Sequence, residues 1–431
     1  MQKETVFYKK NFLIYGFGKS GYASYKFLCK KSNCKIFDDN KKNIPSKYNH
    51  EIINYKQLKK KNFDYIVLSP GIDMHKCRAS TYLKKNRTKI ITELDIFYLS
   101  YPNIKKITIT GTNGKSTTSK LLYDVLKEHG KDARLSGNIG SPILLETNLK
   151  NNTLFIIEAS SYQLEYSKFF KSDYSLILNL SPDHLERHGN FKNYIKAKFK
   201  LIQNQSKNNY AFIEKKNYLL NNLIKKNKTK SKICRVNYKK YSKYYKLIKN
   251  EYFRNIPNFK NLSFVFAISK NLKLSLKKII NVANRFKQLD FRQQIIYQSK
   301  KLIIINDSKS TSLSSAMPLL ESFTNIYWIL GGMAKKGDQL KLKKENFKNI
   351  SAFIYGKDKL IFSKILSNKI KYKVSKNLNN SLLQVFKDLK KKEDQKKILL
   401  FSPSAASFDQ FKNFEDRGKY FNKIIKQHLK N

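Results

Sequence analysis

The sequence is poor in cysteine, proline, glycine and acidic residues, and it lacks a long apolar run. Its four Cys show neither the paired spacing of a zinc site nor a framework of disulfide bridges, which predicts reduced thiols that pack as small hydrophobic side chains in a cytosol. The apolar run FLIYGFG near the start is short, has no small-residue cleavage pattern and continues into glycines. We therefore expect neither a signal peptide nor a membrane span.

Negative charge is scarce as well, because 31 Asp and Glu face 87 Lys and Arg, and the formal net charge is +56. Such a charge is typical of proteins that bind nucleic acid or an acidic membrane surface. Here the excess is almost all lysine, accompanies abundant Asn, Ile, Tyr and Phe, and is scattered along the chain. A/T-rich codons favour this residue set, so we interpret the lysines as solvated faces and expect no nucleic-acid partner. A basic nucleic-acid-binding ATPase is the alternative.

With 431 residues, the chain is long enough for two or three domains with cores of their own. Apolar strand-like runs alternate with helical patterns, which indicates an α/β protein. We expect three domains: a Rossmann-like domain over residues 1–98, a central P-loop ATPase-like domain with a mostly parallel sheet over 99–286, and a Rossmann-like α/β domain over 287–431.

The most informative stretch is residues 107–119, where an apolar run leads into GTNGKST and then into a helical pattern. Gly111 and Gly114 allow main-chain N–H groups to point at an anion, Lys115 adds a positive charge for the outer phosphates, and Ser116 offers a hydroxyl to Mg²⁺. The general P-loop pattern has an earlier glycine where this chain has Ile109. We interpret the stretch as a shorter phosphate loop, followed by a helix that ends at Gly130.

Near the N-terminus, a strand-like run leads to Gly16, Gly18 and Gly21, the GxGxxG spacing of a dinucleotide-type turn. Asp38 and the neighbouring Asp39 follow where a second strand would end. Spacing alone leaves open whether these acids hold a ribose or only form a turn. Another strand ends in the tight turn at 69–71, a position where open α/β sheets bind ligands.

Two later apolar strands end in residues that suit a metal site. The run LFIIE delivers Glu158, whose carboxylate is well placed to hold Mg²⁺ beside a phosphate loop. The run SLILNLSPDHLERH ends in a proline turn with Asp183 and His184, and His188 lies close by. The next helical segment contains Lys196, Lys198 and Lys200 in alternation, so at most one or two of them can point inward.

From about residue 205 to 260 the sequence is rich in Lys, Asn and Tyr with weak periodicity, which we interpret as variable surface with short strands, before two helices. In the last third of the chain, four strand-like runs end in small or charged residues, which predicts another sheet with a ligand-binding edge. These strand ends include Asp307, Lys309, Thr311 and Lys335.

Over essentially its whole length the chain resembles the Mur ligases, the ATP-dependent amide-forming enzymes of peptidoglycan precursor synthesis. The family-wide motifs are GTNGKST, the strand end at Glu158 and SPDHLERH, whereas SPGI, SSYQLE, INDSKST and FSPSAASFDQFKNFEDRG resemble the members that add D-glutamate. The resemblance implies a cytoplasmic enzyme that uses small-molecule substrates, namely UDP-linked muramoyl-alanine, D-glutamate and ATP, with two Mg²⁺ ions. We expect it to be a monomer.

The resemblance also implies roles for matching residues. ATP would be bound by Gly111, Thr112, Asn113, Gly114, Lys115, Ser116, Thr117, Asn261, Arg292, Asp307 and Lys309. The metal would be held by Ser116, Glu158, His184 and Lys198, with Lys198 carbamylated, so that a cation becomes an oxygen ligand. The UDP substrate would be bound by Gly16, Gly18, Asp38, Ser69, Pro70, Gly71 and Asn138. D-Glutamate would be bound by Thr311, Lys335, Ser407 and Phe414. Catalysis would rest on Lys115, Lys198, His184 and Asn138.

Two positions depart from the family pattern. The family's HNxxNA segment appears here as KNLSFVFA, which keeps Asn261 but has Phe264 at the second Asn place, so the adenine contacts are expected to differ. In LGGMAKKGD the matching lysine is either Lys335 or Lys336. A ligase that adds another amino acid, or adds glutamate to folate, is the alternative within the same superfamily.

Overall fold

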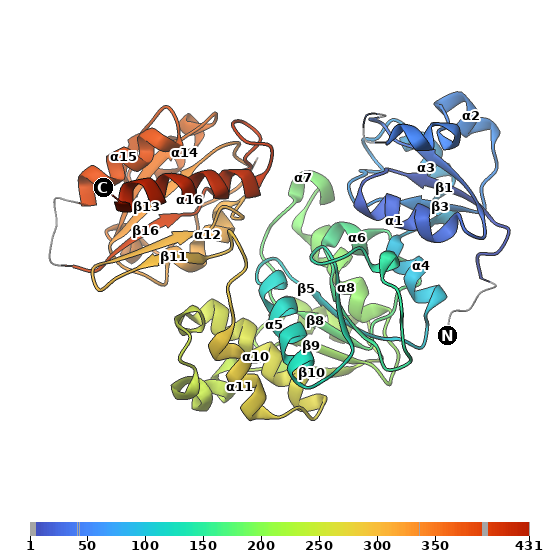
Figure 1. Ribbon diagram of the computed structural model, residues 1–431, viewed down its shortest axis with the longest axis horizontal. Coiled ribbons are helices and arrows are strands. Elements are labelled where there is room, and N and C mark those ends of the chain that lie inside the picture. Colours follow the sequence, from blue (N-terminus) through green and yellow to red (C-terminus); the bar gives the residue numbers. More distant parts are fainter. Residues whose placement is uncertain (1–5, 41, 43, 336, 390–394, 431) are drawn as a thin grey trace. The chain divides into compact units, whose positions relative to one another are not determined.

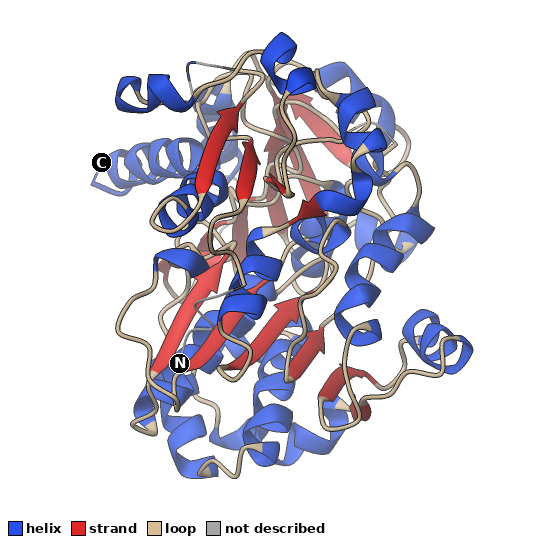
Figure 2. Cartoon of the chain, turned by 90° about the vertical axis from the view of Figure 1, so that its right-hand side faces the viewer, coloured by secondary structure: helices blue, strands red, loops and turns tan. Residues whose placement is uncertain are grey.

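The computed structural model describes residues 6–40, 42, 44–335, 337–389 and 395–430. Three β-sheets, each flanked by helices, are built from successive stretches of the chain (Figures 1 and 2). The chain forms two compact units, of which the first comprises residues 1–180, 187–250 and 259–285 and contains the first two sheets. The second unit comprises residues 181–186, 251–258 and 286–431. Within the described ranges, no helix is both long enough and apolar enough to cross a bilayer.

The first sheet has four parallel strands in the order β2-β1-β3-β4. Its strands are β1 (Asn11–Tyr15), β2 (Asn33–Phe37), β3 (Tyr65–Leu68) and β4 (Ile90–Ile91). The accompanying helices are α1 (Lys19–Leu28), α2 (Tyr55–Lys60), α3 (Ser80–Lys85) and α4 (Glu93–Ser100), with 3-10 turns at Ser46–Glu51 and Arg87–Lys89. Apolar side chains of β1 pack on both faces, as expected for a parallel strand covered by helices.

The second sheet has six parallel strands in the order β10-β9-β8-β5-β7-β6. Its strands are β5 (Lys105–Thr110), β6 (Ala133–Gly137), β7 (Leu154–Glu158), β8 (Tyr174–Ile177), β9 (Tyr210–Glu214) and β10 (Lys232–Val236). The helices are α5 (Lys115–Glu128), α6 (Ser161–Glu165), α7 (Leu185–His188), α8 (Phe191–Gln203), α9 (Tyr218–Lys226), α10 (Ile256–Asn271) and α11 (Leu276–Arg285). Helix α5 packs on β5, β6 and β7. Short 3-10 helices occur at Ile143–Leu145, Tyr238–Leu247 and Glu251–Arg254.

The third sheet has six strands in the order β11-β12-β16-β13-β14-β15, and only β11 runs antiparallel to its neighbour. Its strands are β11 (Gln294–Gln298), β12 (Leu302–Asn306), β13 (Ile326–Gly331), β14 (Ile350–Tyr355), β15 (Lys371–Val374) and β16 (Lys397–Phe401). The helices are α12 (Leu313–Leu320), α13 (Lys344–Phe347), α14 (Lys359–Leu366), α15 (Leu378–Leu389) and α16 (Phe414–Lys430). The fully buried Trp328 lies in the core on one face of this sheet.

These observations confirm the predicted α/β class with three sheets, while the exact boundaries at 98/99 and 286/287 stay a prediction. The short strands expected in 205–260 are confirmed as β9 and the edge strand β10, but the range also contains helix α9, which the interpretation as variable surface missed. Helix α9 buries only Leu220 and Ile224, which form a narrow apolar stripe. The many Lys and Asn residues around this stripe make its helical spacing hard to recognise in the sequence. The C-cap of helix α5 is His129, one residue before the predicted cap Gly130, which has the left-handed conformation.

A buried carboxylate joins α4 to the polypeptide after α6. Asp95 is fully buried, and its Oδ1 accepts hydrogen bonds from the Ser167 hydroxyl at 2.8 Å and from the main-chain N–H groups of residues 168–170 at 2.7–2.9 Å. Its Oδ2 accepts from both the main-chain N–H and the hydroxyl of Thr92 at 2.9 Å. The carboxylate thus satisfies donors from two segments that are more than 70 residues apart in the chain.

We expect Asp95→Ala to lower the free energy of unfolding by about 3 kcal/mol or more, because it leaves buried main-chain N–H groups without an acceptor. Urea denaturation followed by circular dichroism measures the change. Asp124→Ala is the matched control, since Asp124 forms a partly exposed ion pair with Lys120 at 2.6 Å. The control substitution should lower the free energy of unfolding by less than about 1 kcal/mol. A loss for Asp95→Ala no larger than that of the control would contradict the assignment.

Candidate active site

The predicted phosphate loop lies between β5 and α5, as a strand, a four-residue turn and a helix start. Gly111 and Gly114 have φ values of 152° and 82°, which disfavour any residue with a Cβ. A Cβ on Gly114 would lie 2.3 Å from Oδ1 of Asn261, so the Asn261 side chain packs directly against the turn. Gly114 is the N-cap of α5 and has no side chain to cap the first N–H groups of the helix. Uncapped N–H groups at a helix start favour an anion, as the prediction of a phosphate loop requires.

Lys115 places its amine over this turn. Its Nζ donates to the main-chain carbonyls of Gly111 at 2.9 Å and Thr112 at 2.8 Å. Ser116 follows in the first turn of α5 and is half-buried, whereas Thr117 is buried. The structure therefore brings together the residues predicted to hold phosphate at one end of α5, with a cation beside the helix N-terminus.

Asn179 was missed by the sequence analysis, yet it holds the loop in shape. Its Oδ1 accepts from the main-chain N–H of Asn113 at 2.8 Å, and its Nδ2 donates to the main-chain carbonyl of Asn113 at 2.9 Å. Its own carbonyl accepts from the N–H of Thr112 at 3.1 Å. Asn179 follows β8, the strand beside β5, in the run LNLSPDH. A polar residue that ends such a buried run at the ligand-binding edge is the pattern that could have identified it.

Lys198 lies beneath the same loop. On α8 it is 2% exposed, while Lys196 is exposed and Lys200 is half-buried, which confirms that the alternating lysines cannot all point inward. Nζ of Lys198 donates to the carbonyl of Gly111 at 2.9 Å and to Oγ1 of Thr110 at 3.3 Å. It also lies 4.7 Å from the ring centroid of Tyr194.

Glu158 ends β7 next to the loop strand and is 1% exposed. Its Oε1 accepts from Nδ2 of Asn138 at 2.9 Å, whereas its Oε2 has no hydrogen-bond partner among the described residues. A buried carboxylate oxygen without a partner is costly unless a cation or another donor occupies the place. No group of three or more His, Cys, Asp and Glu suited to a metal occurs in the described part of the chain. A single buried carboxylate with one unpartnered oxygen fits Mg²⁺, because this ion takes one or two carboxylates and completes its coordination shell with phosphates and water.

The predicted UDP-binding residues of the first sheet lie at the carboxyl ends of β1, β2 and β3, whereas Asn138 follows β6 in the second sheet and contacts Glu158. The N–H of Phe17 donates to Oδ2 of Asp38 at 2.7 Å, and the hydroxyl of Ser69 donates to the carbonyl of Gly16 at 2.6 Å. A Cβ on Gly21 would lie 1.8 Å from the carbonyl oxygen of Gly16, so the turn requires glycine there. Gly18, Pro70 and Gly71 belong to the same turns, and the side chain of Asp38 is already used to hold the glycine turn.

The second compact unit contains the remaining predicted residues. His184 has a φ of 54°, and its ring nitrogens lie 3.4 Å from Asp183 and 3.5 Å from Glu186. Asp183 in turn pairs with Nζ of Lys335 at 2.6 Å. His188, which sequence analysis noted without a role, lies in the first unit, where its Nε2 is 3.0 Å from the hydroxyl of Ser161. The alternative Lys336 lies outside the described residues.

Asp307, at the end of β12, is buried among polar partners. Burial raises the pKa of its carboxyl to about 7, although the N–H of Gln293 and the hydroxyl of Ser402, each at 3.0 Å, and the charges of Arg292 and Arg417 all favour the anion. The Asp307 proton is therefore lost near neutral pH, where a small change in surroundings alters the charge.

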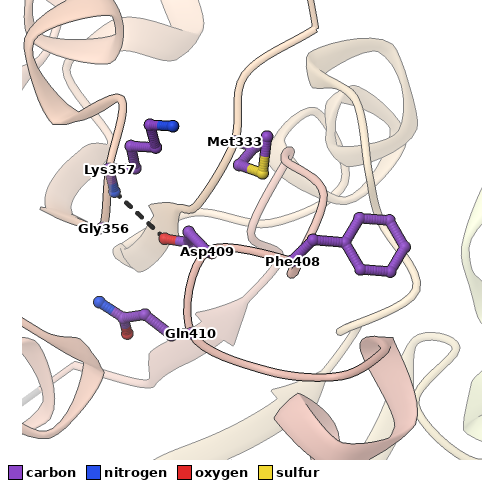
Figure 3. Close-up of a pocket in the computed structure, with 6 residues that line it drawn as sticks. All are labelled: Met333, Gly356, Lys357, Phe408, Asp409 and Gln410. Carbon is purple, nitrogen blue, oxygen red and sulfur yellow. Dashed lines mark hydrogen bonds between the residues drawn. The ribbon is translucent and has the colours of Figure 1, made fainter.

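Phe414 connects predicted ATP-binding and amino-acid-binding residues. Nζ of Lys309 lies 3.9 Å from the centroid of the Phe414 ring, and the Arg292 guanidinium lies 5.8 Å from it. Ser407 is buried in the preceding loop, and Thr311 follows Lys309 in the loop after β12. The neighbouring cavity of about 620 Å³ contains none of the predicted residues (Figure 3). It is lined by Met333, Gly356, Lys357, Phe408, Asp409 and Gln410.

Comparison with known proteins matches this arrangement to one class of enzyme. The family model of the Mur ligase middle domain matches residues 109–286, the stretch that carries the phosphate loop, Glu158, Lys198 and Asn261. The structure is similar to MurF from Acinetobacter baumannii (TM-score 0.56, 15% identity, 75% of this chain and 77% of that one). It is also similar to UDP-N-acetylmuramate-alanine ligase MurC from Thermotoga maritima (TM-score 0.54, 15% identity, 97% and 99%). At these identities the likeness shows a common fold.

Sequence identity is higher to several named relatives. The chain is 33% identical over 97% of its length to a Rickettsia felis protein named UDP-N-acetylmuramoylalanine–D-glutamate ligase, 98% of which is covered. It is 32% identical to a Francisella tularensis protein of the same name, with coverage of 96% and 95%. The chain belongs to the Mur ligase family. It is therefore a ligase that uses ATP with Mg²⁺, as this family does.

Phe264, the departure from the family's adenine segment, is a core residue with 3% exposure on α10. It lies three residues after Asn261, which contacts the phosphate loop from the same helix. Its ring is thus accounted for by packing. The contact between Asn261 and the phosphate loop does not depend on it.

We expect Asn179→Ala to weaken ATP binding about tenfold, because Asn113 loses both the acceptor and the donor that fix its peptide groups. Asn179→Asp should also weaken binding, since the carboxylate keeps the acceptor but repels the Asn113 carbonyl. Titration calorimetry with ATP and Mg²⁺ gives the affinities. Asn204→Ala, a change at the end of α8, is the control. An unchanged affinity in both Asn179 variants would show that the loop keeps its shape without the clamp.

Proposed function

We propose that this enzyme joins the amino group of D-glutamate to the alanyl carboxylate of UDP-N-acetylmuramoyl-L-alanine, with cleavage of ATP to ADP and phosphate. The proposal is carried by the near-complete coverage of relatives that bear this name, at up to 33% identity. The segments INDSKST and FSPSAASFDQFKNFEDRG, which distinguish the D-glutamate-adding members, support it further.

The chemistry explains why ATP is needed. A carboxylate resists attack by an amine because its carbonyl carbon is electron-rich. The alanyl carboxylate would first attack the γ-phosphorus of ATP, which forms an acyl phosphate and releases ADP. The amine of D-glutamate then attacks the acyl carbon, and phosphate leaves from the tetrahedral intermediate as the amide forms. The attacking amine loses one proton as the amide bond forms.

The phosphate loop supplies the electrostatic part of this reaction. Lys115 and the first N–H groups of α5 would bind the phosphates and stabilise the charge that develops on them. Asn261 would stay beside the loop, and Arg292, Asp307 and Lys309 would contact the nucleotide as well. Mg²⁺, when bound, would neutralise phosphate charge, held by Ser116, Glu158, His184 and Lys198. The unpartnered Oε2 of Glu158 supports its role as a ligand.

The two other substrates would be bound outside the loop. The turns with Gly16, Asp38 and Ser69 would bind the UDP group, and Asn138 would lie near the alanyl end. D-Glutamate would be bound by Thr311, Lys335, Ser407 and Phe414. The ion pair of Lys335 with Asp183 supports this, because a carboxylate of the amino acid could take the place of the Asp183 carboxylate.

Carbamylation of Lys198 fits its surroundings. A neutral amine takes up CO₂ and releases one proton to give a carbamate, which keeps one N–H on Nζ and has one negative charge shared by two oxygens. The remaining N–H would still donate to the carbonyl of Gly111, while the oxygens would serve as metal ligands. We further propose that two Mg²⁺ ions take part, and that the enzyme works in the cytoplasm as a monomer without nucleic acid.

The purified protein with Mg²⁺ is expected to release phosphate only when UDP-N-acetylmuramoyl-L-alanine, D-glutamate and ATP are all present. A colorimetric phosphate assay measures the release, and mass spectrometry identifies the amide. L-Glutamate, L-alanine and a folate acceptor serve as controls. Phosphate release that needs no D-glutamate, or that another amino acid or acceptor supports better, would overturn the proposal. Stimulation by DNA or RNA would favour the nucleic-acid-binding ATPase instead.

Lys198→Ala should reduce the rate of amide formation by about two orders of magnitude, because a buried metal ligand is lost. Excess bicarbonate or a short-chain carboxylic acid should restore part of the activity by filling the space with an anion. Lys196→Ala, on the exposed side of the same helix, is the matched control and should keep normal activity. Near-normal activity of Lys198→Ala would refute the role of this lysine.

A further inference from the structure

The first turn of α16 is bonded to the loop that follows β12. The hydroxyl of Ser308 donates to the carbonyl of Phe414 at 2.9 Å, and Nδ2 of Asn306 donates to the carbonyl of Gly418 at 2.9 Å. Ser308 and Asn306 are both fully buried. The loop that carries Asp307 and Lys309 is thus held to the start of the last helix by polar contacts inside the second unit.

Arg417 lies at the centre of these contacts and is 0% exposed. Its Nε donates to the hydroxyl of Ser308 at 3.1 Å, and one terminal nitrogen donates both to the carbonyl of Ser308 at 2.8 Å and to the carbonyl of Ala405 at 3.0 Å. The Ser308 hydroxyl therefore accepts from Arg417 and donates to Phe414. One guanidinium connects the loop after β12 with the loop after β16.

The surroundings leave little freedom for this side chain. A Cβ on Gly332 would lie 3.3 Å from the other terminal nitrogen of Arg417, and a Cβ on Gly418 would lie 2.3 Å from the ring of Phe291. The ring of Phe291 therefore lies against the backbone of Gly418, the residue after Arg417. Phe291 itself is the residue before Arg292 in the chain. Asp307 and Asp409 provide negative charge near the buried cation.

We propose that Arg417 is a positioning residue that couples the nucleotide loop at 307–309 to the amino-acid loop at 405–407. The inference rests on the proposed function, in which these loops contribute residues that bind ATP and D-glutamate. Phe414, one turn before Arg417 on α16, belongs to the same coupled set because its ring lies over Lys309. A planar guanidinium can bond to a hydroxyl and two carbonyls in fixed directions, whereas a lysine amine is a single point.

Steady-state kinetics of Arg417→Lys tests the coupling. We expect the KM for ATP and the KM for D-glutamate to rise together, each about tenfold, because lysine cannot keep the bonds to both loops. The KM for UDP-N-acetylmuramoyl-L-alanine should stay within about twofold, since the residues proposed to bind it lie in the first unit. Lys419→Ala, an exposed change on the same helix, is the control and should leave all three values unchanged.

Ser308→Ala keeps the proposal testable if Arg417→Lys does not fold, because it removes only the hydroxyl that accepts from Nε. It should shift the same two KM values in the same direction by a smaller factor. The double variant should be less than additive. Circular dichroism and thermal unfolding establish which variants are folded. A folded variant with unchanged KM values, or with a change in only one of the two, would overturn the coupling.

The failure of the proposed function can be told apart from the failure of this inference. If the unmodified enzyme releases no D-glutamate-dependent phosphate, the proposed function fails. Calorimetric binding of ATP with Mg²⁺ to the unmodified enzyme and to Arg417→Lys then still tests the nucleotide half of the inference. An affinity reduced about tenfold supports positioning of the 307–309 loop, and equal affinities refute it.

Discussion

Parallel pairing of β5 with β7 on one side and β8 on the other is the constraint on which the catalytic region of the first unit depends. Because carboxyl ends of parallel strands meet at one edge, this pairing brings Gly111, Glu158 and Asn179 together from stretches that are far apart in the chain. Lys198 reaches the same edge from α8. Each of these residues contacts the main chain or a side chain at this edge of the sheet. The register of β5, β7 and β8 therefore determines the shape of the phosphate loop.

Much of this region could be predicted because the residues that bind phosphate and metal carry chemistry visible in the sequence. Glycines that need positive φ, a lysine beside a helix start and an acid at the end of an apolar strand each point to a role on their own. Asn179 has no such chemistry, since its function is to hydrogen-bond the main chain of a turn, and its position after a buried strand is the one signal for it. The role of Arg417 could not be predicted for a similar reason. The sequence contains many basic residues, and only the burial of Arg417 in the structure distinguishes it from the others.

Helix α9 was missed because its core contacts are few and its remaining positions follow the lysine and asparagine bias of the whole chain. That bias also explains why net charge was a poor guide to function. Among the described residues the buried lysines are Lys106, Lys198 and Lys397. Lys106 donates to the carbonyls of Tyr101, Pro102 and Ile104, and burial lowers its pKa to about 8. Each of these three buried lysine amines donates to at least one oxygen acceptor, which offsets part of the cost of its removal from water.

The reciprocal amide contact between Asn179 and Asn113 has an entropic consequence. Fixing the backbone of a flexible residue costs on the order of 1–2 kcal/mol, and a glycine-containing turn has more freedom to lose than most. The side chain of Asn179 already fixes the turn in the folded chain. The entropic cost of ordering the turn is therefore met when the chain folds, and it does not lower the affinity for a ligand. The strand neighbouring β5 thus makes the turn a rigid receptor whose N–H groups are oriented before any anion arrives.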